Sequence, residues 1–167
     1  MRPARRQAGF VLKPKQSRII SHMQTYDTLQ INTDGGSRNN PGPSAVGVYA
    51  TSKNEEVFTI SQYLGIATNN EAEYQAVIYA LNYLIKNNLT AEKVLFVLDS
   101  ELIVKQITGV YKVKQPHLQT LKTEVLSLIK KLIESGQLKD VSFTNVLREK
   151  NKQADFLVNL ALDSLPA

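Results

Sequence analysis

The sequence predicts an α/β domain built on a mixed five-stranded sheet with helices on both faces. Three observations lead to this expectation. Apolar residues first alternate with polar ones in three short segments, which is typical of strands. The apolar spacing then changes to that of a helix. After this change, strand-like and helical segments alternate along the chain, which is typical of α/β folds. The expected order of elements is βββαβααβα, within one domain over residues 27–165.

The first three strands follow from alternation and from turn residues. Leu29, Ile31 and Thr33 alternate with polar neighbours and lead into an Asp-Gly-Gly turn. A second turn, over residues 40–43, precedes a strand at residues 45–51, and a break at Asn54 precedes a strand at residues 56–64. Short strands joined by tight turns predict an antiparallel meander.

The later elements are predominantly helical. Apolar residues recur at helical spacing over residues 70–86, which predicts a helix. The continuous apolar run at residues 94–98 is typical of a strand buried on both faces. We then expect a short helix that ends near Thr108, a helix at residues 116–134, a strand at residues 141–147, and a final helix that carries Ala154 and Leu162.

Composition sets limits on the class of protein. A chain of 167 residues is long enough for one domain with a core and too short for two of ordinary size. No apolar run approaches the ~20 residues that a membrane-spanning helix needs. The absence of cysteine excludes disulfides, thiolate zinc sites and thiol nucleophiles, and it fits a reducing compartment. We therefore expect a cytoplasmic protein without membrane association, and we expect a monomer.

The net charge of +5 is concentrated in the first 26 residues, which hold six basic residues and no acid. The remainder holds fourteen basic and fifteen acidic residues, a net charge of −1. We interpret residues 1–26 as a flexible basic tail. Such a tail could hold phosphate backbone, act in targeting, or be a leader with Met23 as the natural first residue. The sequence leaves these alternatives open.

Two aspartates lie at the carboxyl ends of predicted strands. Asp34 ends the first strand and Asp99 ends the buried strand at residues 94–98. The plain interpretation of Asp34 is a turn residue, and that of Asp99 is a helix N-cap. Ser100 could cap that helix instead, which would leave Asp99 available. Because ligands in open α/β sheets gather at the carboxyl ends of strands, both aspartates are candidates for a site.

Glu73 is the most informative acid. It shares one helical stripe with Val77, Leu81 and Leu84, so its side chain should face the sheet. A buried carboxylate is costly unless it is paired or bound to a metal. Compensation of the helix dipole is the alternative, but Glu71 can serve that purpose in a capping box that begins at residue 68.

Asp155 belongs to the first turn of the last helix, where acids often complement the helix dipole. Its candidacy rests on the other three acids, not on its own position.

These residues carry a resemblance to type 1 ribonuclease H. Four blocks in the order of that family span roughly residues 28–163: Asp34-Gly35-Gly36-Ser37 with Asn40-Pro41-Gly42-Pro43, Thr68-Asn69-Asn70-Glu71-Ala72-Glu73, Leu98-Asp99-Ser100, and Arg148-Glu149-Lys150-Asn151-Lys152-Gln153-Ala154-Asp155. The resemblance implies a ribonuclease H-like fold and an endonuclease that hydrolyses the RNA strand of RNA–DNA hybrids.

The resemblance also implies the site. Asp34, Glu73, Asp99 and Asp155 would be the catalytic residues and would hold two Mg²⁺ ions, for which Mn²⁺ can substitute. Asp34 would bridge both ions. The positions that match substrate contacts of the family are Gly35, Ser37, Asn40, Thr68, Asn69 and Asn70. Most of these would meet the minor groove of the hybrid, partly at RNA 2′-hydroxyls, which distinguish RNA from DNA, while Thr68 would lie near a DNA-strand phosphate.

Two departures from the family pattern concern the surroundings of the acids. Glu101 stands where the family often has glutamine. Many members also carry a histidine on the loop before the last helix, whereas here residues 147–150 read Leu-Arg-Glu-Lys. The missing histidine keeps an alternative open, a catalytically weak module of the same fold that binds hybrid or double-stranded RNA. A proofreading-type exonuclease is disfavoured. Such an enzyme needs an Asp-x-Glu pair on the first strand, whereas residues 34–36 here are Asp-Gly-Gly.

Overall fold

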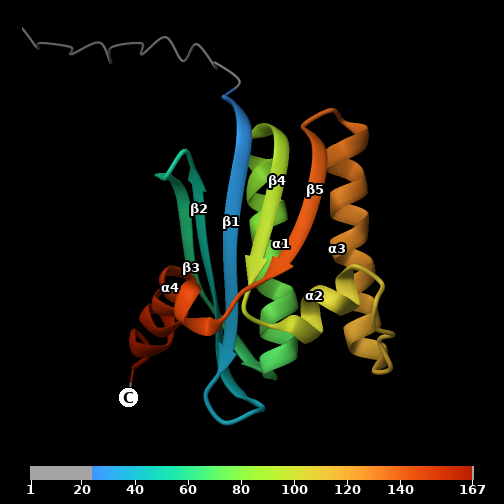
Figure 1. Ribbon diagram of the computed structural model, residues 1–167. Helices are drawn as coiled ribbons and strands as arrows, with labels where there is room; N and C mark the ends of the chain where they lie inside the picture. Colours follow the sequence, from blue (N-terminus) through green and yellow to red (C-terminus); the bar gives the residue numbers. More distant parts are fainter. Residues whose placement is uncertain (1–23, 167) are drawn as a thin grey trace, which may run out of the picture.

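The computed structural model describes residues 24–166, and Figure 1 shows their arrangement. The strands are β1 (Thr25–Ser37), β2 (Gly42–Ser52), β3 (Glu55–Ala67), β4 (Thr90–Leu98) and β5 (Leu138–Asn145). The helices are α1 (Asn69–Lys86), α2 (Glu101–Ile107), α3 (Pro116–Glu134) and α4 (Lys152–Asp163), with a 3₁₀ turn, η1 (Arg148–Lys150), before α4. The predicted element order is confirmed. Most of the predicted basic tail, residues 1–23, lies outside the described residues.

The five strands form one mixed sheet in the order β3-β2-β1-β4-β5. β1, β2 and β3 pair antiparallel, as the predicted meander requires, whereas β4 pairs parallel with both β1 and β5. The central strand is therefore β1. The turn expected at Asp34-Gly35-Gly36 is wrong, because β1 continues to Ser37 and these residues pair with β2. Asp34 is therefore a strand residue and not a turn residue. Because β1 and β4 run in the same direction, their carboxyl ends lie at the same end of the sheet. Asp34, near the end of β1, and Asp99, just after β4, both lie there.

Helices cover both faces of the sheet, as predicted (Figure 1). α1 and α3 pack on one face over the main core, which includes the fully buried Leu29, Phe96 and Leu81. On the other face α4 covers a small apolar cluster around Ala45 and Val158. Among residues 24–166, no helix combines the length and apolar character that crossing a bilayer requires.

The last strand ends earlier than the sequence predicts. The expectation of a strand at residues 141–147 is wrong at both ends, since β5 covers Leu138–Asn145. Its neighbour β4 ends at Leu98, which pairs with Asn145, and the amide of Val146 donates the last hydrogen bond to the Leu98 carbonyl at 2.8 Å. Beyond that point the chain has no strand to pair with, so it turns through η1 into α4.

Candidate active site

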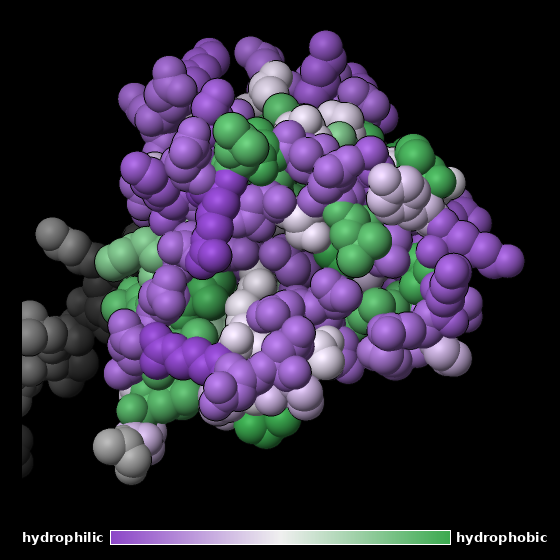
Figure 2. Space-filling model, turned by 60° about the horizontal axis from the view of Figure 1, so that its bottom comes forward, coloured by the Kyte–Doolittle hydropathy of each residue, from purple (hydrophilic) through white to green (hydrophobic). Residues whose placement is uncertain are grey.

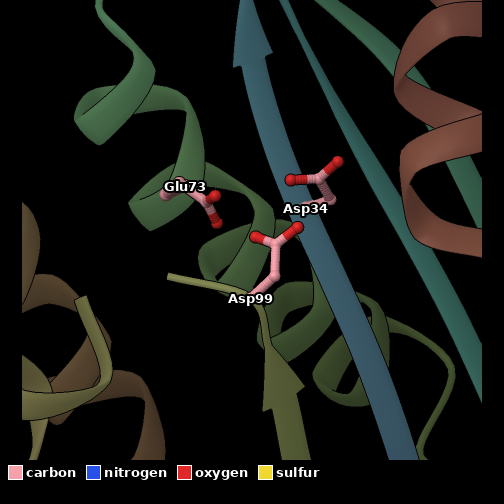
Figure 3. A group of neighbouring side chains, drawn as sticks. All are labelled: Asp34, Glu73 and Asp99. Carbon is pink, nitrogen blue, oxygen red and sulfur yellow. The ribbon is translucent and has the colours of Figure 1, made fainter. Parts of the chain in front are cut away.

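Three of the four predicted acids form one cluster at the carboxyl ends of β1 and β4. Asp34, Glu73 and Asp99 each place a carboxylate oxygen within 4.8 Å of the others. Figure 3 shows Asp34 on β1, Glu73 on α1 and Asp99 just beyond β4, with their carboxylates directed toward a common space. Asp34 and Glu73 are each only 7% exposed. Carboxylate oxygens at this spacing can hold one hard divalent cation.

Helix capping by neighbouring residues leaves Glu73 and Asp99 available. The Ser100 hydroxyl accepts a hydrogen bond from the Ile103 amide and caps α2, so Asp99 does not serve as the N-cap. At α1, Thr68 and Glu71 form a reciprocal capping box. Both expectations from the sequence are confirmed, and the plain interpretation of Asp99 as a helix cap is wrong.

Gly35 allows α1 to approach β1 closely enough to place Glu73 beside Asp34. A Cβ atom at Gly35 would lie 2.1 Å from the carbonyl carbon of Ala72 and 2.3 Å from the amide nitrogen of Glu73. These are main-chain atoms, so any side chain larger than hydrogen would push the helix away from the strand. The absence of a Cβ at Gly35 therefore helps to set the separation of two of the acids.

A second glycine has the same effect for α4 on the opposite face. Gly47 lies directly across from Asp34 in the β1–β2 ladder. A Cβ at Gly47 would lie 2.1 Å from the carbonyl oxygen of Ala154 and 2.9 Å from the amide nitrogen of Val158. Ala154 immediately precedes Asp155, so the close contact brings that acid toward β1. The sequence analysis did not single out Gly47, and nothing in its local sequence marks it.

Asp155 lies on the same cleft as the cluster but outside the group of three. The cleft is lined by all four acids and by Arg148. Asp155 is only partly buried, and its Oδ1 accepts a hydrogen bond from the Arg148 guanidinium at 3.1 Å. The structure thus brings all four predicted acids to one cleft and pairs the fourth with a cation.

Burial and mutual repulsion raise the pKa of the clustered carboxyl groups. The pKa of Asp34 is raised to about 7, first by desolvation and then by the charges of Asp99 and Asp155, while Arg148 opposes the change. Desolvation, followed by the charges of Asp34 and Asp99, raises the pKa of Glu73 well above its usual value. The pKa of Asp99 is also raised, mainly by burial. The cluster therefore favours an added positive charge, either a proton or a cation.

One carboxylate oxygen of the cluster has no hydrogen-bond partner among residues 24–166. Glu73 Oε2 is buried and makes no hydrogen bond with any described residue. An unpaired buried carboxylate oxygen is costly, and coordination to a cation offsets that cost. The donors of Asp34, Glu73 and Asp99 are all hard oxygen atoms, which suits Mg²⁺ or Mn²⁺. The residues present therefore fit a divalent metal.

Buried amides fix the start of α4 against β1. Asn151 is 1% exposed; its side-chain amide donates to the Thr33 carbonyl at 2.9 Å and its side-chain oxygen accepts from the Asn32 amide at 3.0 Å. The main-chain carbonyl of Asn151 accepts from the Asp155 amide. The sequence analysis did not identify this role of Asn151, because the partners are more than a hundred residues apart in the chain.

Three of the predicted substrate-contact residues, Ser37, Asn40 and Asn69, bond to one another beside the cleft, which Ser37 and Asn69 line. Asn69 Oδ1 accepts from the Ser37 amide at 2.8 Å, and Asn40 Oδ1 accepts from the Asn69 amide at 3.0 Å. The Thr68 hydroxyl is engaged in the α1 cap. Asn70 lines a neighbouring hollow with Lys112. Ser37, Asn40, Thr68 and Asn69 thus each stabilise this part of the fold, and contact of any of these residues with substrate stays a prediction.

The surface at this end of the molecule is polar. Figure 2 brings forward the end that carries the β1–β2 turn and shows predominantly hydrophilic residues, with separate small hydrophobic areas among them. A polar cleft that contains buried carboxylates suits a polar, charged ligand better than an apolar one.

Comparison with known proteins agrees with this arrangement. The family model described as "Reverse transcriptase-like" matches residues 32–161. The solved structure of LC11-RNase H1 in complex with RNA/DNA hybrid has a TM-score of 0.74 and 40% sequence identity, covering 81% of this chain and 96% of that one. The chain belongs to the type 1 ribonuclease H family. The resemblance inferred from the four motif blocks is thereby confirmed, as is the fold.

The first curated relatives that the chain matches are longer proteins. The chain is 39% identical over 136 residues to a bifunctional protein of Mycobacterium tuberculosis, which covers 80% of this chain and 35% of that relative. It is 37% identical over 131 residues to ribonuclease HI of Halobacterium salinarum, which covers 78% of this chain and 62% of that relative. The chain thus spans about a third of the first relative and about three-fifths of the second.

Proposed function

We propose that this protein is an endonuclease that hydrolyses the RNA strand of RNA–DNA hybrids at the cleft formed by Asp34, Glu73, Asp99 and Asp155. The observation that carries the proposal is the cluster of three carboxylates within 4.8 Å of one another, two of them buried, with a glutamate oxygen that lacks a partner in the part of the chain that the structure describes. A relative of the same fold, 40% identical, has been solved with an RNA/DNA hybrid bound.

The four acids divide into two groups around Asp34. Asp34, Glu73 and Asp99 would hold one Mg²⁺ ion, and Asp34 with Asp155 would hold a second; Mn²⁺ can replace either. When bound, such a pair of ions supplies an activated water and relieves charge at the leaving oxygen. Asp34 is suited to share both ions because it lies on the central strand, between α1 on one face and α4 on the other.

The protein's own residues supply orientation. Gly35 on β1 fixes the distance of α1 from that strand, Gly47 on β2 fixes the distance of α4 from β2, and Asn151 fixes the first turn of α4 against β1. Ser37, Asn40 and Asn69 form a bonded edge beside the acids. The side-chain NH2 groups of Asn40 and Asn69 would donate to 2′-hydroxyls of the RNA strand, while the Ser37 hydroxyl donates to the Ala67 carbonyl and would accept. Gly35, Thr68 and Asn70 complete the proposed substrate surface. A monomeric state and a cytoplasmic location stay predictions.

A cleavage assay tests this proposal. RNA–DNA hybrid labelled on the RNA strand is incubated with the protein in Mg²⁺, in Mn²⁺ and in EDTA, beside Asp34→Asn. We expect metal-dependent internal cuts in RNA by the parent protein and loss of at least about a thousandfold in rate for the variant, since a shared ligand is removed. Absence of cleavage with either metal, together with retained hybrid binding, would favour the alternative of a binding module.

A further inference from the structure

Arg148 occupies a position that joins the cleft to the segment before α4. It is the first residue of η1, and its guanidinium lines the cleft with all four acids. Its Nη2 donates to Asp155 Oδ1 at 3.1 Å. The second arginine of the cleft, Arg38, pairs with Asp163 near the end of α4. Among the residues of the described chain that line the cleft, Arg148 is thus the cation paired with one of the four acids.

The Arg148–Asp155 pair is weakly held. The Arg148 side chain is 80% exposed and that of Asp155 is 32% exposed, and exposed ion pairs contribute only about 0–1 kcal/mol. The guanidinium bonds to a single oxygen of Asp155, and seven residues separate the two along the chain. A divalent cation near Asp155 would repel the guanidinium and bind the same carboxylate more strongly. The pair can therefore open at little cost.

A released guanidinium remains at the mouth of the cleft. Arginine is always charged and binds phosphate oxygens through a planar fork of N–H donors. A nucleic-acid backbone that enters the cleft brings phosphates to the place that the guanidinium can reach. The residues that face Arg148 from the packed elements are Asp34, Asp99 and Asp155, all of them acids that would be engaged by metal.

We infer that Arg148 is an exchangeable counter-cation: it pairs with Asp155 in the metal-free protein and moves to a backbone phosphate of the hybrid once a divalent ion binds Asp155. This inference rests on the proposed function for its second half only. Its first half, competition between Arg148 and the metal, concerns the protein alone and can be measured without substrate.

The experiment uses the full chain and compares Arg148→Ala, Arg148→Lys and Lys150→Ala. Lys150→Ala is the matched control. This substitution removes one positive charge from the same 3₁₀ turn, at a residue that does not line the acid cleft. Mn²⁺ binding is measured by calorimetry without nucleic acid. We expect Arg148→Ala to bind Mn²⁺ about two- to fivefold more tightly than the parent, in keeping with the strength of an exposed pair. Arg148→Lys should be intermediate, and Lys150→Ala unchanged.

A double-mutant comparison separates the specific pair from a general charge effect. In an Asp155→Asn background, loss of Arg148 should no longer tighten Mn²⁺ binding. Unchanged or weaker Mn²⁺ binding by Arg148→Ala, an equal effect of Lys150→Ala, or persistence of the effect without Asp155 would each overturn the exchange. Thermal unfolding of every variant confirms that it is folded, and Arg148→Lys keeps the test valid if Arg148→Ala is not.

The move of Arg148 to a backbone phosphate is measured with hybrid and Mg²⁺. Arg148→Ala should raise KM about three- to tenfold with kcat changed less than about twofold, and should reduce the salt dependence of hybrid binding by about one phosphate contact. Lys in place of Arg148 should restore most of the salt dependence. An unchanged KM and salt dependence would refute the move to phosphate. A parent protein that binds Mn²⁺ but cuts no hybrid would instead count against the proposed function, while the metal titrations would still decide the exchange.

Discussion

The carboxylate cluster should make the metal-free protein less stable at neutral pH, and Asp34→Asn should relieve this effect. Burial, followed by the charges of Asp99 and Asp155, raises the pKa of Asp34 from 3.8 to about 7. The folded protein therefore holds a proton that the unfolded chain releases. Because the folded-state pKa lies above the unfolded one, the stability contributed by this group is fully present below about pH 4 and is lost as the pH rises through about 7.

The size of the effect follows from the change in pKa. A rise of about three pH units at about 1.36 kcal/mol per unit gives an upper value of about 4 kcal/mol. Asparagine has nearly the same shape and does not ionise. The free energy of unfolding of Asp34→Asn, relative to the parent, should therefore improve by about 2–4 kcal/mol between pH 4 and pH 8 in EDTA.

The assay is urea unfolding followed by circular dichroism, at several pH values in EDTA and then in excess Mg²⁺. Asp140→Asn is the control, because Asp140 is exposed on β5 and lies outside the cleft. Mg²⁺ at about a hundred times its dissociation constant should stabilise the parent at pH 8 by about 2.7 kcal/mol and the variant by much less. A stability difference between Asp34→Asn and the parent that stays constant with pH, or that falls as the pH rises, would refute the reasoning.

Three further substitutions and one control probe how the site is positioned. Gly47→Ala should displace α4, because the new Cβ would lie 2.1 Å from the Ala154 carbonyl oxygen. We expect a loss of about 2–4 kcal/mol in the free energy of unfolding by urea, together with loss of most metal-dependent cleavage. Gly36→Ala is the control and should be far milder in the same urea titration, because its Cβ would meet only a side-chain methyl at 3.2 Å. Asn151→Ala should cost about 2–3 kcal/mol by leaving a buried carbonyl and a buried amide without partners, again measured by urea unfolding. Thr68→Ala should cost about 1 kcal/mol through loss of the α1 cap and should lower the thermal midpoint by about 2–4 °C. Equal effects of the two glycine substitutions, or wild-type stability of either of the other variants, would contradict these assignments.

The sequence predicted the parts of the site that depend on local pattern. The inward direction of Glu73 followed from its helical stripe, and the freedom of Asp99 followed from a serine one residue later that could cap α2. Both are local properties, because they involve residues within about three helical turns. The order and antiparallel pairing of the first three strands followed from alternation and from the turn over residues 40–43 and the break at Asn54. The turn expected at Asp34-Gly35-Gly36 was wrong, since those residues continue β1 beside β2.

The parts that escaped prediction depend on contacts between distant segments. Gly47 matters because α4, a hundred residues later, packs its main chain against it, and Asn151 matters because β1 lies beneath it. Neither partner can be identified from one sequence. The early end of β5 has the same origin, since it is set by where β4 stops. The pairing of Arg148 with Asp155 was also missed, although both residues were named in one motif block.

The two glycines contacted by helix backbone have a consequence for how the protein can change over time. The positions of Glu73 and Asp155 are set by contacts between the main chains of their helices and the main chain of the sheet at Gly35 and Gly47. Such contacts do not depend on the side chains of the surrounding residues. Substitutions on the outer faces of α3 or α4 can therefore accumulate without altering the spacing of the acids. A methyl group at either glycine, by contrast, would meet helix main chain and change that spacing.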